Sequence, residues 1–217
     1  MERFFRIAID GPGGAGKSTI AKAVAKELNI DYIDTGAMYR AFGLKLLRLS
    51  NSMEDEDSLR KILDETSIDF EGKEIILDGE IVTPLIRTPE VSMAASKCSA
   101  FAKVREKMVE AQQKMGESKS VIMDGRDICE VVFPNAEYKF FITADAEERA
   151  SRRYKELLAK GQKVVYSEVL KEIEERDHND STRAASPMKR AADAELLDTT
   201  NMTIEEATQY ICNKVRA

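Results

Sequence analysis

The sequence is short of basic residues, of cysteine and of long apolar stretches, and each shortage excludes a class of protein. Its 217 residues carry 33 Lys and Arg against 39 Asp and Glu, a formal net charge of −6. Affinity for nucleic acid comes largely from basic side chains that neutralise phosphates. We therefore expect no general binding to nucleic acid, and any anion that the chain binds must be held by a local cluster of donors.

The chain has only three cysteines, Cys98, Cys129 and Cys212, and they lie far apart. This number and spacing fit free thiols in a reducing compartment better than a disulfide framework. No apolar run approaches the ~18 residues that a membrane helix requires. Arg6 and Asp10 interrupt the N-terminal apolar stretch, which is therefore unlike a secretory signal. We expect a cytoplasmic protein without a membrane partner.

What the sequence does contain is typical of one compact domain, or of one domain with a sizeable insertion. Hydrophobic residues make up 43% of the chain and charged residues 33%. Short apolar runs alternate with helical patterns, and alternation of this kind predicts an α/β fold whose parallel sheet is flanked by helices. The five predicted strands are Phe4–Ile9, Ile30–Ile33, Ser120–Met123, Tyr138–Ile142 and Glu195–Leu197.

Residues 66–84 depart from this alternation. Their short apolar runs are separated by two glycine turns, Glu71-Gly72-Lys73 and Asp78-Gly79. Asp-Gly between short β-branched runs is a strong hairpin signal. We therefore predict a small antiparallel β meander inserted into the α/β core.

Two further regions are predicted to be helical. One is an alanine-rich stretch from Val91 to Gln113, and the other is the highly charged region Ala146–Arg183, with a break around Lys160-Gly161-Gln162. Helix-capping patterns occur at Asp145-x-x-Glu148 and at Thr203-x-x-Glu206.

A glycine-rich segment, GPGGAGKST, connects the first predicted strand to the first predicted helix. It matches the P-loop pattern G-x-x-x-x-G-K-[ST]. Glycines let backbone N–H groups converge on phosphate oxygens, and the N-terminus of the next helix adds its positive end. Lys17 is placed to reach the β- and γ-phosphates, and the Ser18 hydroxyl to coordinate Mg²⁺. The segment predicts a nucleoside triphosphate site.

A P-loop alone leaves the fate of the γ-phosphate open between three classes of protein. A GTPase switch would require a base-reading N-K-x-D, which the sequence lacks. A hexameric motor is usually longer and carries a basic channel or a sensor module. A small-molecule kinase fits 217 residues, provided that the chain also holds an acceptor site.

Candidate acceptor residues follow the predicted strands. One apolar strand ends at Asp124, which can hold Mg²⁺ directly or through water, or can instead cap the next turn. Arginines follow where the carboxyl ends of parallel strands open onto a crevice. Guanidinium matches phosphate bidentately, so a set of arginines favours an acceptor that carries its own phosphate. The set is Arg40, Arg126, Arg176 and Arg183.

Seven segments in a fixed order resemble the bacterial cytidylate kinases: GPGGAGKST, DTGAMYR, IRTPEVSMAAS, VREKM, DGRD, FPNAEYKFFI and ERDHNDSTRAASP. The resemblance runs from Ile7 to about Thr200. It implies a P-loop NTPase core with a five-stranded parallel sheet (1–34, 119–146 and 184–217), an NMP-binding region containing the meander (35–118) and a helical lid (147–183). It also implies transfer of the γ-phosphate of ATP to CMP or dCMP in pyrimidine nucleotide metabolism, by a protein that we expect to be a monomer.

The resemblance also implies roles for individual residues. ATP would be bound by Gly11, Pro12, Gly13, Gly14, Ala15, Gly16, Lys17, Ser18 and Thr19, and by Arg149, Arg152 and Arg153 of the lid. The CMP phosphate would be bound by Thr35, Arg40, Arg126 and Arg183, the cytosine by Ser96, Arg105 and Asp127, and the sugar by Arg176 and Asp180. Catalysis would depend on Lys17, Arg126, Arg153 and Arg183, and Mg²⁺ on Ser18, with Asp124 acting through water.

The chain departs from the family pattern after DGRD, where Cys129-Glu130 stands in place of Gly-Thr. A carboxylate added near a phosphate site is mildly unfavourable, so we expect an altered local loop path and not a loss of activity. Two alternatives stay open: a kinase for another nucleoside monophosphate or small metabolite, and a nucleotide-bound regulatory switch. The lone His178 lies in a charged run and is expected to face solvent.

Overall fold

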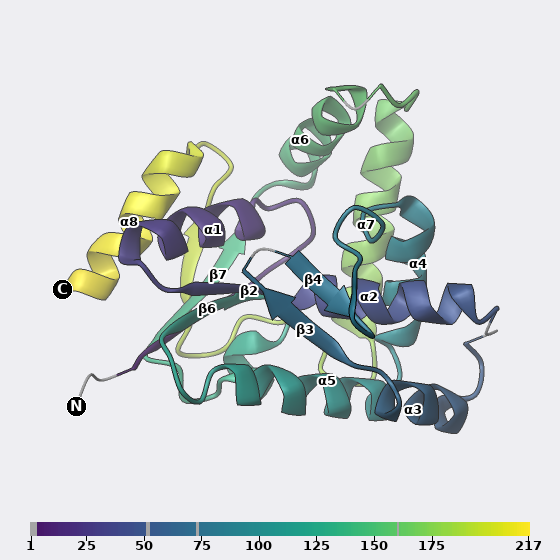
Figure 1. The fold of residues 1–217 in the computed structure, drawn as a ribbon. Helices are drawn as coiled ribbons and strands as arrows, with labels where there is room; N and C mark the ends of the chain where they lie inside the picture. Colours follow the sequence, from purple (N-terminus) through teal and green to yellow (C-terminus); the bar gives the residue numbers. More distant parts are fainter. Residues whose placement is uncertain (1–3, 51–52, 73, 160) are drawn as a thin grey trace. The chain divides into compact units, whose positions relative to one another are not determined.

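The computed structural model describes residues 4–50, 53–72, 74–159 and 161–217 (Figure 1). The chain divides into two compact units. Unit 1 comprises Met1–Tyr32 and Ser118–Ala217, and unit 2 comprises Ile33–Glu117. In the part of the chain that is described, no helix is long and apolar enough to span a membrane.

A parallel sheet forms the centre of unit 1. Its strands are β1 (Arg6–Asp10), β2 (Asp31–Asp34), β6 (Val121–Asp124), β7 (Tyr138–Thr143) and β8 (Glu195–Asp198), in the order β2-β6-β1-β7-β8. Strand β1 pairs in parallel with both β6 and β7, and β7 pairs in parallel with β8. The predicted α/β fold with a five-stranded parallel sheet is confirmed.

Two helices of unit 1, α1 (Lys17–Leu28) and α8 (Ile204–Arg216), pack side by side (Figure 1). The fourfold spacing of Ile20 and Val24 places both on one face of α1, and both are fully buried in the same core as Ile211 of α8. The predicted capping box opens α8: the Glu206 N–H donates to Thr203 Oγ1 at 3.2 Å, and the Thr203 N–H donates to Glu206 Oε2 at 2.8 Å.

The charged region of unit 1 forms the helices α6 (Ala146–Ala159) and α7 (Tyr166–Thr182). They pack through a small core of Ala150, Leu157 and Val169. The predicted break between them is confirmed, since α6 ends at Ala159 and α7 begins at Tyr166, and Gly161 has a φ of 75° there. Lys160, which the predicted break includes, lies outside the described residues. His178 is exposed on α7, as expected.

Unit 2 contains the predicted meander beside a helical layer. Strands β3 (Ile68–Glu71), β4 (Glu74–Leu77) and β5 (Glu80–Ile81) pair antiparallel in that order. Asp78 and Gly79 form the two-residue turn between β4 and β5, with φ values of 50° and 84°, as a type I′ turn requires. The other predicted turn includes Lys73, which lies outside the described residues.

The helices of unit 2 are α2 (Thr35–Arg48), α3 (Glu56–Asp64), α4 (Pro89–Cys98) and α5 (Ala102–Met115). The prediction of one helical stretch from Val91 to Gln113 is wrong in one respect, because the chain turns at residues 99–101. Phe101 there has an extended backbone, with φ −80° and ψ 129°. The turn lets α4 and α5 both pack against α2, which one straight helix of that length could not do.

At Gly43, α2 lies close to the backbone of α4. A Cβ at this position would lie 2.9 Å from the Ala95 backbone nitrogen. Gly43→Ala should therefore destabilise the protein, because overpacking costs ~1–3 kcal/mol and exceeds the ~1 kcal/mol that alanine gains in helix propensity. We expect a melting temperature lower by about 2–6 °C in thermal unfolding. An unchanged or raised melting temperature would contradict close packing of these helices.

Candidate active site

The P-loop passes directly from β1 to α1 through a position that only glycine can occupy. Gly11 has a φ of 141°, and a Cβ there would lie 1.9 Å from the Ile142 carbonyl oxygen. Gly16 precedes α1 at the N-cap position and has no side chain to cap the helix. The first N–H groups of α1 are thus available to an anion, and the positive end of the helix dipole favours one.

Lys17 lies against its own loop. Its Nζ donates to the Pro12 carbonyl oxygen at 2.7 Å, and the residue is only 5% exposed. Burial lowers the pKa of Lys17 well below its usual value, and the positive charge of Arg126 adds to this effect. A bound phosphate would act in the opposite sense and stabilise the charged ammonium. The arrangement is suited to an anion that arrives with its own negative charge.

Ser18, at the start of α1, and Asp124, at the end of β6, bring together side-chain oxygen atoms of the kind that bind metal ions. The Ser18 hydroxyl donates to Asp124 Oδ2 at 2.9 Å, and the Tyr32 hydroxyl donates to Oδ1 at 2.7 Å. Among the described residues, no group of three or more His, Cys, Asp or Glu side chains could hold a metal ion. Mg²⁺ in a nucleotide site needs no such group, because it uses one or two protein oxygens together with phosphates and waters. The donor set therefore fits Mg²⁺.

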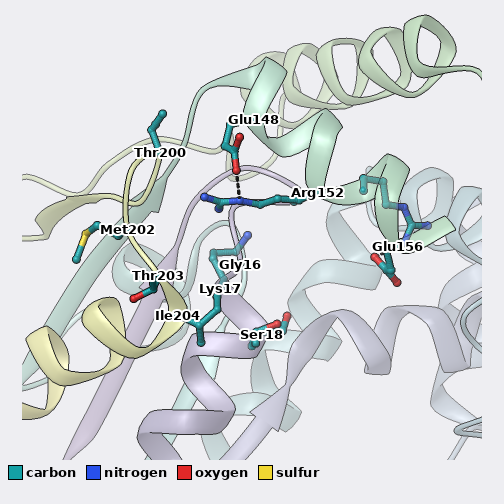
Figure 2. Close-up of a pocket in the computed structure, with 13 residues that line it drawn as sticks. Gly16, Lys17, Ser18, Glu148, Arg152, Glu156, Thr200, Met202, Thr203 and Ile204 are labelled. Atoms are coloured by element: carbon teal, nitrogen blue, oxygen red, sulfur yellow. Dashed lines mark hydrogen bonds and ion pairs between the residues drawn. The ribbon is translucent and has the colours of Figure 1, made fainter. Parts of the chain in front are cut away.

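A pocket of about 630 Å³ opens beside the P-loop within unit 1. Figure 2 shows Arg152 extended between Glu148 and the P-loop residues Gly16 and Lys17, with its Nε donating to Glu148 Oε1 at 2.9 Å. The lining residues are Gly14, Gly16, Lys17, Ser18, Thr19, Glu148, Arg152, Arg153, Glu156, Thr200, Met202, Thr203 and Ile204. The pocket thus combines phosphate-binding groups with an apolar wall, as a nucleoside triphosphate requires.

The three arginines of α6 differ in their surroundings. Arg149 is buried and bound on three sides: it donates to the carbonyls of Gly13 at 2.9 Å and Ala144 at 2.8 Å and pairs with Asp177 at 2.6 Å. Arg152 and Arg153 line the pocket, and Arg153 pairs with Glu156 at 2.9 Å. Arg149 therefore connects the P-loop backbone to α7, and the other two face the pocket.

Asp180 lies among the arginines of the predicted acceptor site in unit 1. Arg126 Nε donates to Asp180 Oδ2 at 2.7 Å, and Arg183 lies 3.9 Å from Oδ1. Burial opposes ionisation, but Arg126, Arg176 and Arg183 together hold the pKa of Asp180 below its usual value. A Cβ at Gly13 would lie 3.5 Å from Arg126 Nη2 and 3.7 Å from Arg176 Cδ. The cluster is thus adjacent to the phosphate loop.

Of the remaining predicted acceptor residues, Asp127 lies in unit 1 and the other four lie in unit 2, on α2, α4 and α5. Arg105 is 5% exposed, stacks 5.7 Å from the centre of the Tyr39 ring and donates to the Ser99 carbonyl at 3.3 Å. Thr35 is buried at the start of α2, Arg40 is half-buried one turn later, and Ser96 is exposed on α4. Arg105 therefore lies close to the helix that carries Arg40, since Tyr39 precedes it.

Residues 128–132 form a turn of π-helix, η1 (Ile128–Val132), directly after Asp127. Cys129 is fully buried in it and burial raises the pKa of its thiol, while the added carboxylate of Glu130 pairs with Lys189 at 3.1 Å. All three cysteines are free thiols, as expected, and all three are buried.

Several contacts of the site were not predicted from the sequence. Tyr32 orients Asp124, Arg87 pairs with Asp34 at 2.6 Å, and Asp177 binds Arg149. The apolar wall of the pocket at residues 202–204 was also missed. One signal was available: Tyr32 lies within the predicted strand that precedes DTGAMYR, and a tyrosine there has a hydroxyl that must find a partner when the strand is buried.

Comparison with known proteins agrees with this geometry. The cytidylate kinase family model matches residues 7–217. The chain belongs to the cytidylate kinase family. It is 50% identical over 211 residues to the cytidylate kinase of Caldanaerobacter subterraneus subsp. tengcongensis, covering 97% of this chain and 94% of that one. It is also 50% identical over 209 residues to the cytidylate kinase of Clostridioides difficile, covering 96% and 97% of the two chains.

Solved structures resemble this cytidylate kinase in fold. An uncharacterized protein from Eubacterium ventriosum matches with a TM-score of 0.57 at 14% identity, over 98% of this chain and 99% of that one. Shikimate kinase from Bacteroides thetaiotaomicron matches with a TM-score of 0.51 at 15% identity, over 99% and 100% of the two chains. The fold is that of the P-loop kinases, and the protein is a nucleotide-binding phosphotransferase with cytidylate kinase activity.

Lys17→Ala should leave the fold intact and lower turnover by about 10²–10³-fold, as loss of a donor to the transition state does in other enzymes. Lys26→Ala removes an exposed lysine from the same helix and serves as the control. The measurement is kcat in a coupled assay, with thermal unfolding of each variant. Near wild-type turnover of Lys17→Ala would remove this side chain from the mechanism.

Proposed function

We propose that this cytidylate kinase transfers the γ-phosphate of ATP to CMP or dCMP, with the triphosphate of ATP bound in the pocket of unit 1. The observation that supports this site is the convergence of the P-loop, the Ser18–Asp124 pair and Arg152 on one pocket. ATP would be held by the backbone of Gly11–Thr19 and by Arg152 and Arg153. Arg149, which donates to the Gly13 carbonyl, would assist by fixing the shape of the loop.

Mg²⁺ would be held by Ser18, with Asp124 acting through water. When bound, the ion would neutralise charge on the β- and γ-phosphates. Asp124 would act on the ion through an oriented carboxylate, because Ser18 and Tyr32 already fix its two oxygens at 2.9 and 2.7 Å. This assignment explains why a tyrosine contacts a strand-end aspartate.

Phosphoryl transfer demands positioning and charge neutralisation more than covalent chemistry. We assign these tasks to four cations, each near the phosphates. Lys17 and Arg153 line the pocket, and Arg126 and Arg183 surround Asp180 beside Gly13. Asp180 pairs with both of these arginines and orients them before a substrate binds, which reduces the reorganisation that transfer requires.

We assign the CMP contacts separately for the residues of each unit. In unit 1, Arg126 and Arg183 would bind the phosphate, Arg176 and Asp180 the sugar, and Asp127 the cytosine. In unit 2, we assign Thr35 and Arg40 to the phosphate and Ser96 and Arg105 to the cytosine. The burial of Arg105 against Tyr39 supports a specific task, since a guanidinium is rarely buried without one.

We also propose that the protein acts as a monomer in the cytoplasm, within pyrimidine nucleotide metabolism. The three buried free thiols fit a reducing compartment.

Side-by-side assays of CMP, dCMP, UMP, AMP and shikimate, with ATP as the donor, test the proposed reaction. We expect CMP and dCMP to be the best acceptors, and we expect a chelator of divalent cations to abolish turnover. Higher kcat/KM for AMP or shikimate would overturn the acceptor assignment. ATP hydrolysis without transfer to any acceptor would favour a regulatory switch, and full activity in the chelator would exclude Mg²⁺.

Asp127→Asn tests how cytosine is distinguished from uracil. Cytosine presents an amino donor where uracil presents a carbonyl, and a carboxylate accepts only from the former. The substitution replaces a charged acceptor worth ~1.5–3 kcal/mol, so kcat/KM for CMP should fall about tenfold or more. UMP should lose less or gain, because the amide can donate to the uracil carbonyl.

Asp180→Asn is the matched control for this experiment, because it changes a neighbouring carboxylate that is assigned to the sugar. It should lower kcat/KM for CMP and UMP alike. If the CMP-to-UMP ratio of kcat/KM is the same in Asp127→Asn as in the wild type, Asp127 does not distinguish cytosine from uracil.

A further inference from the structure

Asp10 is a buried carboxylate that has no part in the site as described so far. It is the last residue of β1, it precedes Gly11 of the P-loop, and it is 0% exposed. Each of its oxygens accepts one backbone hydrogen bond: Oδ1 from the N–H of Ile128 and Oδ2 from the N–H of Cys129, both at 2.8 Å. A single side chain thus binds two consecutive backbone donors.

These two donors begin the π-helical turn η1, immediately after the pair Arg126-Asp127. On the other side of the pair, the Gly125 N–H donates to the Ile9 carbonyl at 2.9 Å. The segment is therefore anchored to the end of β1 at both ends, through Ile9 before the pair and through Asp10 after it. Only Arg126 and Asp127 lie between the two anchors.

The short span between the anchors limits where the two side chains can point. Further backbone contacts stiffen the turn, because the Asp127 carbonyl accepts from the N–H of Val131 at 2.9 Å and of Val132 at 3.4 Å. Since the anchors act on the backbone, they tolerate the local change to Cys129-Glu130.

A carboxylate suits this task better than any other side chain of similar size. It offers two acceptor oxygens and no donor, whereas an amide of the same shape would turn an N–H₂ group toward one of the two backbone N–H groups. The position is costly for the fold, because burial raises the pKa of Asp10 to about 6. Buried groups that oppose stability are commonly retained for function.

We propose that Asp10 is a positioning residue for the acceptor, acting through the backbone of Ile128 and Cys129 to aim Arg126 and Asp127. The inference rests on the proposed assignment of those two side chains to CMP. Asp10 contacts the segment that carries Arg126 and Asp127. Loss of its carboxylate should therefore raise KM for CMP more than KM for ATP, although Asp10 adjoins the P-loop in sequence.

Asp10→Asn tests this inference in the full-length enzyme, with Cys129→Ala as the matched control. The control removes the buried Cys129 thiol, which also interacts with the Asp10 carboxylate, but it keeps both backbone donors, so it separates the thiol contact from the two backbone contacts. For Asp10→Asn we expect KM for CMP to rise at least tenfold, the CMP-to-UMP ratio of kcat/KM to fall, and KM for ATP to change less than about twofold. Cys129→Ala should lower the melting temperature and leave these three quantities near their wild-type values.

Two results would overturn the proposal. One is a destabilised Asp10→Asn enzyme with wild-type KM for CMP and a wild-type CMP-to-UMP ratio, which would make Asp10 purely structural. The other is an equal rise of KM for ATP and CMP, which would place its effect on the P-loop. If Asp10→Asn does not fold, Asp10→Glu takes its place, because it keeps two acceptors but displaces them; KM for CMP should then rise severalfold with ATP unaffected.

Asp127→Asn, measured in parallel, separates this inference from the proposed function. Suppose that the CMP-to-UMP ratio changes in Asp127→Asn, while Asp10→Asn keeps the wild-type ratio and the wild-type KM for CMP. This result would overturn the proposal for Asp10 and leave the base-reading assignment of Asp127 intact. An unchanged ratio in Asp127→Asn would defeat the base-reading assignment, and KM for CMP in Asp10→Asn would still decide whether Asp10 positions Arg126.

Discussion

The arrangement of unit 1 depends on charged groups buried where the central strands end. Asp10 ends β1, Asp124 ends β6 beside it, and Lys17 begins the helix that β1 leads into, all at most 6% exposed. Each such group is unfavourable by itself and is tolerated because a neighbour binds it. Two backbone N–H groups bind Asp10, two hydroxyls bind Asp124 and a carbonyl binds Lys17. Phosphate-binding groups are therefore fixed before any nucleotide arrives.

The same principle extends to the arginines of unit 1. Arg126 and Arg183 are held by Asp180, and Arg149 by Asp177 and the Gly13 carbonyl. Both carboxylates lie on α7, three residues apart, so one helix orients cations that lie close to the P-loop. A change in the position of α7 would alter both sets of contacts together, which couples this helix to the phosphate site through ordinary ion pairs.

The sequence predicted the elements of the fold well, because most of their signals are local. The strand runs, the Asp78-Gly79 turn, the capping box at Thr203 and the break at Gly161 each depend on a few neighbouring residues. The break at residues 99–101 was missed because the apolar spacing continues across it, and only packing of α4 and α5 against α2 favours two helices.

Those residues of the candidate site that belong to a sequence motif could be predicted. Those whose role depends on a contact between distant parts of the chain could not. The P-loop residues were found from spacing alone. The role of Tyr32 depends on its approach to Asp124, 92 residues away, and that of Asp10 on contacts 118 and 119 residues away. The guanidinium of Arg149, a residue that we expect at the ATP site, donates to two backbone carbonyls and pairs with Asp177, and no single-residue pattern contains these contacts.

The three buried thiols can also be used to measure how often parts of the structure open locally. Cys98 lies in the core of unit 2, and Cys129 and Cys212 lie in unit 1. Burial raises the pKa of all three thiols, that of Cys98 to about 12, so the reactive thiolate is scarce as long as the side chain stays enclosed. The rate at which each cysteine reacts with an alkylating reagent therefore measures how often its own surroundings open, without any label having been introduced.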